Sequence, residues 1–279
     1  MAKLMLMPNN KEFDYECDAY LIGISGLSVN MPIYFSLDEI KNLDFSKEIF
    51  ISLNKNIHSD DLALLEDTLK VLNDLDITGI FFYDNGVFNM AKRLNLDINL
   101  VYAQEHMGTN HETLNFWHDR GINYALLSEE ISENEIIGIR NNTNIKLILP
   151  IFGYFPMFVS RRHLVKNYLD YFNLNDDSSI NYISKEGKIY PIVDSDVTTV
   201  YTSSYLNGIK EYVDFSKNGI DYVLINSFLV SDSNIRKILS MFKSVDDGNK
   251  DEYFDSINNI LDHNIDTFFL HKESIYKVK

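Results

Sequence analysis

A regular alternation between short apolar runs and helical segments constrains this chain more than any other feature. The apolar runs contain four to six residues and are rich in β-branched and aromatic side chains, without polar alternation. Such runs are typical of parallel strands that are buried on both faces. The predicted strands are Ala19–Ile24, Glu48–Leu53, Gly79–Tyr83, Asn99–Tyr102, Tyr124–Leu127, Lys146–Ile151, Thr198–Thr202 and Tyr222–Ile225.

Helical patterns occupy most of the segments between these strands. After Ser59, leucines recur at three- and four-residue steps from Leu62 to Leu75, which predicts a helix with one apolar stripe. Ser132 and Glu135 fit a capping box at the start of another helix. Eight strands, most of them followed by a helix, predict a closed (β/α)8 barrel, with an open doubly wound sheet as the main alternative.

The connection between the sixth and seventh predicted strands is too long for a single helix. Two strand-like runs flank Glu186 and Gly187, so we expect a β-hairpin insertion at about 176–195. After the eighth predicted strand, two amphipathic segments predict a C-terminal helical extension over about 232–279. No proline-rich or low-complexity linker divides the chain, and we interpret residues 1–279 as one barrel domain.

Charge and cysteine content argue against several functions. The formal net charge is −16, from 41 acidic and 25 basic residues, which opposes nucleic-acid binding by this chain alone. Cys17 is the single cysteine, so the chain can form no internal disulfide and cannot hold a cysteine-ligated cluster by itself. No segment reaches the roughly 18 apolar residues of a membrane span. We therefore expect a cytoplasmic protein without a membrane partner or a cofactor.

Parallel barrels place their sites at the carboxyl ends of the strands, so the polar residues there are candidates. Asp84 and Glu130 follow predicted strands and could act as catalytic acid and base if they converge. The alternative is that Asp84 fixes a βα turn and Glu130 caps a helix. Asn54, Gln104 and Tyr154, at other strand ends, are candidate substrate-binding residues.

The histidine spacing does not favour a metal site. His106, His111 and His118 lie close together in the sequence, with Glu105 and Glu112 beside them. No two of these histidines have the four-residue spacing that places two ligands on one helix face, so we expect no metal. Gly-rich phosphate loops of the G-x-G-x-x-G or G-x-x-x-x-G-K type are also absent.

The segment Leu147–Leu169 carries the densest basic cluster. A predicted buried strand ends at Phe152, and the chain then passes through a glycine turn to Arg161 and Arg162. Two adjacent guanidinium groups at a barrel rim suit the recognition of a carboxylate or a phosphate. Alternatively, one arginine pairs with a rim carboxylate and the other is solvated.

This segment and its surroundings resemble the collagenase-like peptidase family of uncertain catalytic type, the U-thirty-two peptidase family. Members of that family run from a strand through a His-Gly-x turn and an apolar stretch to Ser-x-Arg. Further similarity occurs at the first, second and fifth predicted strands and after the hairpin, so the resemblance covers roughly residues 18–226. The matching residues are Asp18–Gly23, Ser52–Asn54, Leu126–Ser132, Phe152–Tyr154, Met157, Phe158, Ser160–Arg162 and Tyr190–Asp194.

Several residues that are typical of the family are missing here. Phe152 stands where the family's turn has a histidine. The cysteines that hold an iron–sulfur cluster in several members are absent, and Phe155 and Pro156 lie in the region of one of them. Leu224–Phe228 occupies the place of a Lys-Ile-Glu-Gly-Arg-like run. Either the family's chemistry does not depend on these groups or this chain has lost it.

Three functions follow as hypotheses. Better understood members resemble subunits of tRNA wobble-uridine or quinone hydroxylation systems, in which two family members often work together. The first hypothesis is therefore a non-cluster subunit that supports tRNA wobble-uridine hydroxylation together with a longer, cysteine-bearing paralogue, and that meets tRNA only through the complex. The second is a peptidase or other hydrolase in which Glu130 or Asp84 activates water. The third is a small-molecule binding barrel in which Arg161 or Arg162 holds a carboxylate ligand, such as a prephenate-like acid.

Overall fold

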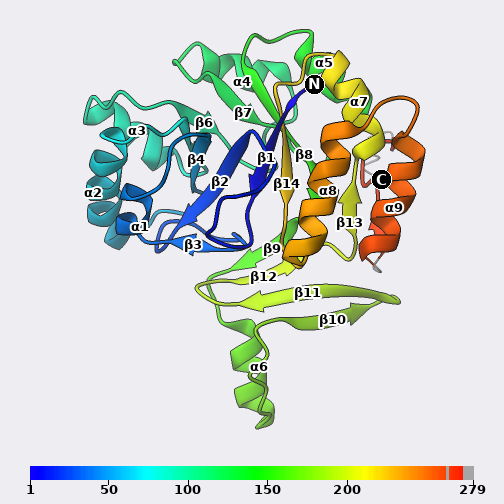
Figure 1. Cartoon of the computed structure of the whole chain (residues 1–279). Coiled ribbons are helices and arrows are strands. Elements are labelled where there is room, and N and C mark those ends of the chain that lie inside the picture. The colour runs from blue at the N-terminus through cyan, green and yellow to red at the C-terminus, as the bar shows by residue number, and fades with distance from the viewer. Residues whose placement is uncertain (262–263, 273–279) are drawn as a thin grey trace, which may run out of the picture.

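The computed structural model describes residues 1–261 and 264–272, and these residues contain a closed barrel of eight parallel strands (Figure 1). The last strand pairs with both the first and the seventh, and these two pairings close the ring. The predicted fold class is confirmed. In order, the barrel strands are β1 (Lys3–Met7), β2 (Ala19–Ile24), β4 (Glu48–Leu53), β5 (Gly79–Phe82), β6 (Leu100–Tyr102), β7 (Tyr124–Leu126), β8 (Lys146–Gly153) and β14 (Tyr222–Asn226).

The strand prediction needs two corrections. Lys3–Met7 is the first barrel strand, and the prediction does not include it because Met and Leu are weaker strand signals than β-branched residues. The predicted barrel strand Thr198–Thr202 instead forms β12 (Thr198–Tyr201) in a separate antiparallel sheet. Its residues are largely buried although they are outside the barrel, and burial gives both kinds of strand the same apolar pattern.

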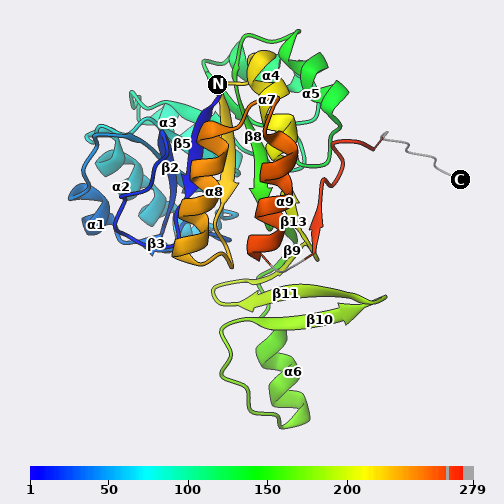
Figure 2. The ribbon, with the colours of Figure 1, turned by 45° about the vertical axis from the view of Figure 1, so that its right-hand side comes forward.

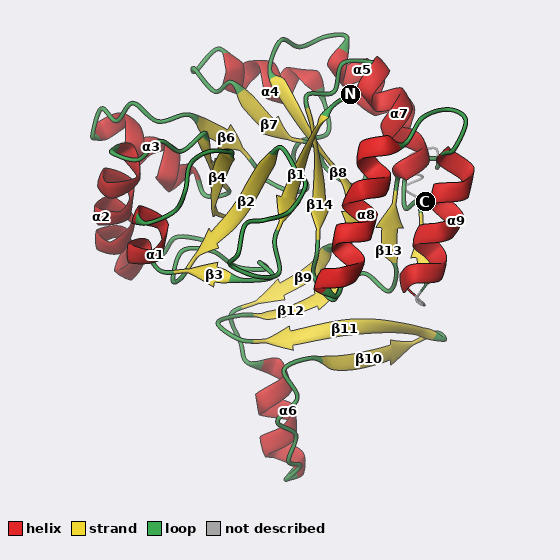
Figure 3. Ribbon diagram, viewed as in Figure 1, coloured by secondary structure: helices red, strands yellow, loops and turns green. Residues whose placement is uncertain are grey.

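Helices cover the outer face of the ring (Figure 3). Ser132 and Glu135 form the predicted capping box. The predicted C-terminal extension contains two helices and then a short strand, while its residues 262–263 and 273–279 lie outside the described residues. The elements around the ring are β3 (Tyr34–Phe35), α1 (Leu37–Lys41), η1 (Ser59–Asp61), α2 (Leu62–Asn73), α3 (Asn85–Arg93), α4 (His111–His118), α5 (Glu133–Arg140), β13 (Tyr205–Asn207), α7 (Ile209–Lys217), α8 (Asp232–Ser244), α9 (Lys250–Leu261) and β15 (Ile265–Asp266).

The barrel strands bury apolar side chains on both faces. Inside the ring, the Phe50 side chain meets the rings of Phe81, Tyr124 and Tyr222 edge-on, with centroids 5.7 to 5.8 Å apart. Outside the ring, the leucine stripe of α2 is buried against the strands. Inward and outward side chains alternate along each barrel strand. If this alternation continues past the end of a strand, successive polar residues there face in turn the barrel mouth and the helices.

Residues 156–201 form an arm that leaves the barrel at the carboxyl end of β8 and projects away from it (Figures 1 and 2). A two-residue turn at Glu186 and Gly187, both with positive φ, joins two antiparallel strands at the place of the predicted hairpin. This hairpin follows the seventh barrel strand rather than the sixth. The elements of the arm are β9 (Pro156–Ser160), α6 (Leu164–Phe172), β10 (Asn181–Lys185), β11 (Lys188–Asp194) and β12.

Hydrogen bonds at the base of the arm hold it against the barrel mouth. The Thr199 hydroxyl of β12 donates to Asn30 Oδ1, in the loop after β2, over 2.6 Å. Asn226, the last residue of β14, donates its side-chain amide to the Tyr154 carbonyl, just before β9. The arm therefore forms one side of whatever site lies at the carboxyl end of the barrel. In the described part of the chain, no helix has the length and apolar character that are needed to span a bilayer.

Candidate functional site

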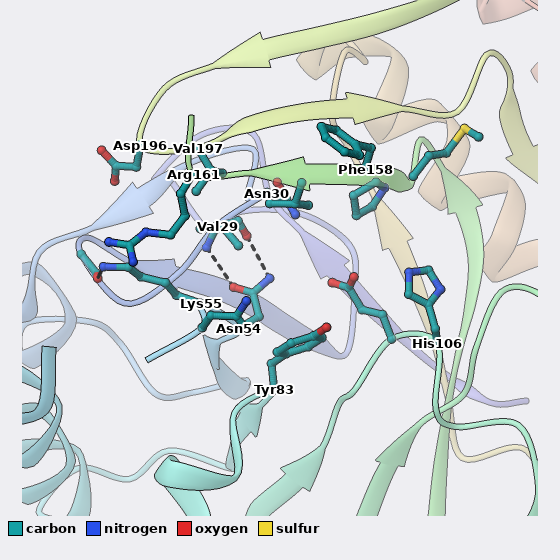
Figure 4. Close-up of a pocket in the computed structure, with 16 residues that line it drawn as sticks. Val29, Asn30, Asn54, Lys55, Tyr83, His106, Phe158, Arg161, Asp196 and Val197 are labelled. Carbon is teal, nitrogen blue, oxygen red and sulfur yellow. Dashed lines mark hydrogen bonds between the residues drawn. The ribbon is translucent and has the colours of Figure 1, made fainter. Parts of the chain in front are cut away.

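A pocket of about 600 Å³ lies between the carboxyl ends of the barrel strands and the arm (Figure 4). The barrel contributes Asn54, Tyr83 and Glu105, which follow β4, β5 and β6, and the arm contributes Phe158 and Arg161. A smaller cavity of about 60 Å³ lies deeper and shares Glu105 with the pocket. The pocket is therefore at the end of the barrel where parallel barrels carry their sites.

Two half-buried carboxyl groups at the barrel mouth are the chemically distinctive part of this region. Glu105 and Glu129 follow the adjacent strands β6 and β7, and both line the smaller cavity. Burial raises the pKa of Glu105, although His106 opposes this effect. Burial raises the pKa of Glu129 to about 8, and the charges of Glu105 and Glu130 act in the same direction. Near neutral pH Glu129 is therefore largely protonated and can donate a hydrogen bond or a proton.

Glu130 lies further out on the rim than its neighbour Glu129. Its side chain is 44% exposed, and its Oε1 lies 3.8 Å from His106 Nδ1, which is too long for a hydrogen bond. Glu130 lines another pocket of about 300 Å³, together with Glu129 and His106, on the side of β15. Glu130 is thus near the candidate site, but it has more solvent around it than Glu129.

Asp84 fixes the turn between β5 and α3, which is the predicted alternative to a catalytic role. It is the N-cap of α3, and its Oδ1 accepts a hydrogen bond from the Gly86 amide over 2.7 Å. Its Oδ2 accepts from the Ile57 amide over 3.1 Å. Neither Asp84 nor Glu130 is part of the lining of the 600 Å³ pocket.

Three predicted substrate-binding residues are occupied by contacts within the protein. Asn54 lines the pocket but exchanges two 2.9 Å hydrogen bonds with the Val29 backbone. The Gln104 amide group donates to the Tyr83 carbonyl and to Asn85 Oδ1. Tyr154 is buried, with its ring 4.0 Å from that of Tyr205, and burial raises its pKa to about 12. These contacts position the loops of the mouth.

The two adjacent arginines, Arg161 and Arg162, differ in their relation to the pocket. Arg161 lines the pocket and points from the arm toward the same side of the mouth as Lys55 (Figure 4). Lys55 is occupied by Asp61 and the Gly26 carbonyl, at 3.0 Å each, whereas Arg161 forms no ion pair within the described residues. The backbone of Arg162 bonds to Thr198 and Ser160, and this residue is not part of the pocket lining.

The three histidines of this region have different neighbours, and His106 lies beside Glu130. His111 lies 3.5 Å from Glu112, and His118 contacts the Ile122 carbonyl at 3.3 Å. In residues 1–261 and 264–272, no three His, Cys, Asp or Glu side chains form a group that could hold a metal ion.

The prediction of catalytic residues did not include Glu105 or Glu129. Val101 of β6 and Ala103 just after it face the inside of the barrel, so Glu105, two residues further on, faces the barrel mouth. That alternation could have identified Glu105. Glu129 had no comparable signal, because the chain leaves the regular strand after Leu126.

The fold and this pocket define a (β/α)8 barrel with an acidic site at its carboxyl end, partly roofed by an arm. The chain belongs to peptidase family U32, whose family model matches residues 10–277. It is 25% identical to tRNA hydroxylation protein P2 of Bacillus subtilis in an alignment of 284 positions that covers 92% of this chain and 92% of that protein. It is 26% identical to tRNA hydroxylation protein P1 of the same organism over 162 residues, which cover 56% of this chain and 38% of that protein.

Solved structures resemble the chain only weakly. A chitinase from Rhizomucor miehei aligns with a TM-score of 0.43 and 11% identity, and the alignment covers 87% of this chain and 99% of the chitinase. A glycoside hydrolase family 18 chitinase from Cycas revoluta aligns with a TM-score of 0.35, 9% identity and coverage of 74% and 84%. Likenesses at this level carry no functional argument.

Proposed function

We propose that this chain is the non-cluster subunit of a tRNA hydroxylation system, and that it works on wobble uridine with a longer, cysteine-bearing member of peptidase family U32. The observation that carries the proposal is the match to tRNA hydroxylation protein P2 over 92% of both chains. Protein P1 of the same organism is the longer of the two relatives, since 162 aligned residues make up only 38% of it. A short member and a long member in one organism suit a two-subunit system.

Cysteine and charge support the same proposal. Cys17 is buried and burial raises its pKa to about 11, so it is not suited to be a thiolate ligand of a cluster. The net charge of −16 opposes direct tRNA binding, so the partner would supply the basic surface. Such a subunit would act in the cytoplasm, and tRNA would reach the barrel mouth through the complex.

Within this role, we assign the acid function at the mouth to Glu129, with Glu105 beside it. The raised pKa of Glu129 allows it to donate a proton or a hydrogen bond to a polar group of a bound molecule near neutral pH. Glu130 lies on the rim of the same region, and Arg161 provides the cationic group at the pocket's other side.

The experiment that tests the proposed function is deletion of the gene in its native host, followed by mass spectrometry of tRNA nucleosides. Hydroxylated wobble uridine should disappear, and the wild-type gene should restore it. The matched control is Cys17→Ala, which should restore the modification fully, because no cluster is assigned to this chain. Unchanged nucleosides in the deletion strain would overturn the proposal.

A second candidate function is a hydrolase that acts through Glu129. The observation in its favour is that the carboxyl group of Glu129, which is largely protonated near neutral pH, lines a pocket of about 300 Å³, large enough for a small ligand. The purified chain alone should then cleave peptides, and Glu129→Gln should abolish the cleavage. Absence of turnover by the purified wild-type chain would remove this candidate and leave the subunit role untouched.

A further inference from the structure

Helix α6, at the far end of the arm, has aromatic side chains that no described residue of the chain buries. Its nine residues have a strongly amphipathic sequence, yet none of them is buried. Tyr171 is 80% exposed, Tyr168 57% and Phe172 53%, and the rings of Tyr168 and Tyr171 both contact that of Phe172 at centroid distances below 5 Å. Short helices in water depend on packing of their apolar face for stability. The arrangement indicates that another molecule completes this packing.

The exposed apolar surface of the arm is large enough to form a substantial part of a protein interface. Large aromatic side chains carry about 150–250 Å² each, so the exposed apolar residues of α6 and the hairpin together expose several hundred Å². One partner contributes roughly 800 Å² to a standard protein interface. Apolar residues that are exposed singly on a monomer are common, whereas a cluster of them marks an interaction site. The residues are Leu164, Tyr168, Tyr171 and Phe172 of α6 and Tyr182, Ile183 and Ile189 of the hairpin.

The charge of the arm favours a protein over a nucleic acid. Residues 156–201 contain five Lys and Arg against six Asp and Glu, so the arm lacks the basic excess that a phosphate backbone requires. The rest of the chain contains 20 basic residues against 35 acidic ones. The arm is thus the nearly neutral part of a strongly acidic molecule, which is where a partner can approach with the least electrostatic cost.

The same charge distribution opposes self-association. A second copy would bring together two bodies that each carry an excess of fifteen acidic residues, which repel one another. A different chain is therefore the favoured occupant. We propose that the apolar surface of α6 and the hairpin is the docking surface for the longer family member, and that this contact places the partner beside the barrel mouth. The inference rests on the proposed function for the identity of the partner.

The position of the surface explains how docking would affect the site. The arm begins directly after β8, and its strand β9 and Arg161 line the pocket. A partner on α6 and the hairpin therefore contacts the same structural unit that forms one wall of the pocket. Docking would hold that wall in place.

The test uses the full chain, co-expressed with the longer family member encoded in the same genome. The variant is the triple substitution Tyr168→Ser, Tyr171→Ser and Phe172→Ser, and the matched control is Phe116→Ser, an aromatic residue of α4 that is 49% exposed. Binding is measured by biolayer interferometry on the purified proteins. We expect the triple variant to lose about tenfold or more in affinity, as removal of central aromatic contacts does in other interfaces, and the control to bind like the wild type. A circular dichroism melt of each variant shows that the barrel is folded, and Tyr171→Asp provides a second, single-site test of the same surface.

The outcomes separate the docking surface from the proposed function. If the wild type and the triple variant bind the longer member equally, the docking surface is wrong while the subunit role stands. If the wild type does not bind the longer member at all, both fail. If the chain alone forms a dimer that the triple variant abolishes, the occupant is a second copy and the proposal is overturned. If the triple variant loses binding of tRNA but not of the partner, the surface belongs to RNA and the proposal is likewise overturned.

Discussion

In the barrel, large apolar side chains are buried on both sides of the strands, whereas in the arm many of them face solvent. The contrast is sharpest between Phe50, which is fully buried among three aromatic rings, and Tyr171, which is 80% exposed. Both belong to segments that are rich in large apolar side chains. Their surroundings differ because the barrel strands close on themselves, while no residue of α6 is buried by the described part of the chain.

The contrast teaches that the two regions obtain their stability from different sources. The barrel satisfies its backbone hydrogen bonds and its apolar surface internally, so it is the part that determines the free energy of unfolding. The arm has its sheet, a hydrogen bond from Thr199 and a continuous chain connection to hold it, and it leaves an apolar surface for another molecule. Mutations should therefore separate stability from association.

The largest expected effect is that of Phe50→Ala inside the barrel. Removing a fully buried aromatic side chain should lower the free energy of unfolding by about 3–5 kcal/mol. The matched change in the arm, Tyr171→Ala, should alter it by no more than about 0.5 kcal/mol, because the side chain is exposed. Urea unfolding followed by circular dichroism measures both values. Similar losses for the two variants would contradict the division between a self-sufficient barrel and an arm that awaits a partner.

The junction between barrel and arm provides the next test. Gly153 ends β8 with a φ of +119°, and a Cβ there would lie 2.5 Å from the Asn226 carbonyl oxygen. Gly153→Ala should therefore cost at least about 1–3 kcal/mol from backbone strain, and the contact with Asn226 should add to it. Gly187→Ala is the control within the arm: its φ is +76°, but no atom lies within 4 Å of the added Cβ. Equal thermal shifts for the two variants would indicate that close packing at the junction contributes nothing.

How much of this molecule its sequence predicts differs between the same two regions. The barrel follows from apolar runs and helical stripes, because a closed parallel sheet imposes both patterns on the chain. In the arm, the same patterns wrongly predict a barrel strand at Thr198–Thr202. Residues that are buried between a small sheet and the barrel mouth have the composition of a barrel strand. The treatment of residues 1–279 as one domain stays a prediction.

Whether a residue at the end of a strand belongs to the candidate site depends on which face of the strand it lies on. A run of wholly apolar residues does not reveal that face. Phe50 and Ser52 face the inside of β4, so Asn54 lines the pocket, and Val101 places Glu105 there in the same way. Asp84 has the opposite parity and caps α3 instead. Glu129 could not be found by this rule, because its position depends on an irregular turn. The choice between Arg161 and Arg162 depended on the path of the arm.

Glu129 makes the stability of the barrel mouth depend on pH. Its pKa is raised from 4.5 to about 8, so between these values the folded protein keeps a proton that the unfolded chain releases. The free energy of unfolding should therefore fall as the pH rises through this window, by at most about 1.4 kcal/mol per pH unit and by less because the group is in contact with the pocket. Glu129→Gln should flatten this dependence and be more stable than the wild type above pH 8.

Urea unfolding at pH 5.5, 7 and 8.5 measures the slope, and Glu130→Gln is the control. An unchanged slope in Glu129→Gln would show that its carboxyl group titrates normally.

The smallest expected effect concerns the bond that fastens the arm to the barrel. Thr199→Val keeps the shape of the side chain but removes the hydroxyl that donates to Asn30 Oδ1 over 2.6 Å. The global free energy of unfolding should change by about 1 kcal/mol, the net value of one hydrogen bond. Local opening of the arm should increase more, because this bond joins β12 directly to the loop after β2. Hydrogen exchange resolves the two effects: amides of β11 and β12 should exchange faster, while those of β4 and β5 should not.

Val159→Thr is the matched control, since Val159 pairs with Thr199 in the sheet but is exposed. If Thr199→Val speeds exchange equally in the barrel, the arm and the barrel unfold as one unit and the contrast between them is one of surface only.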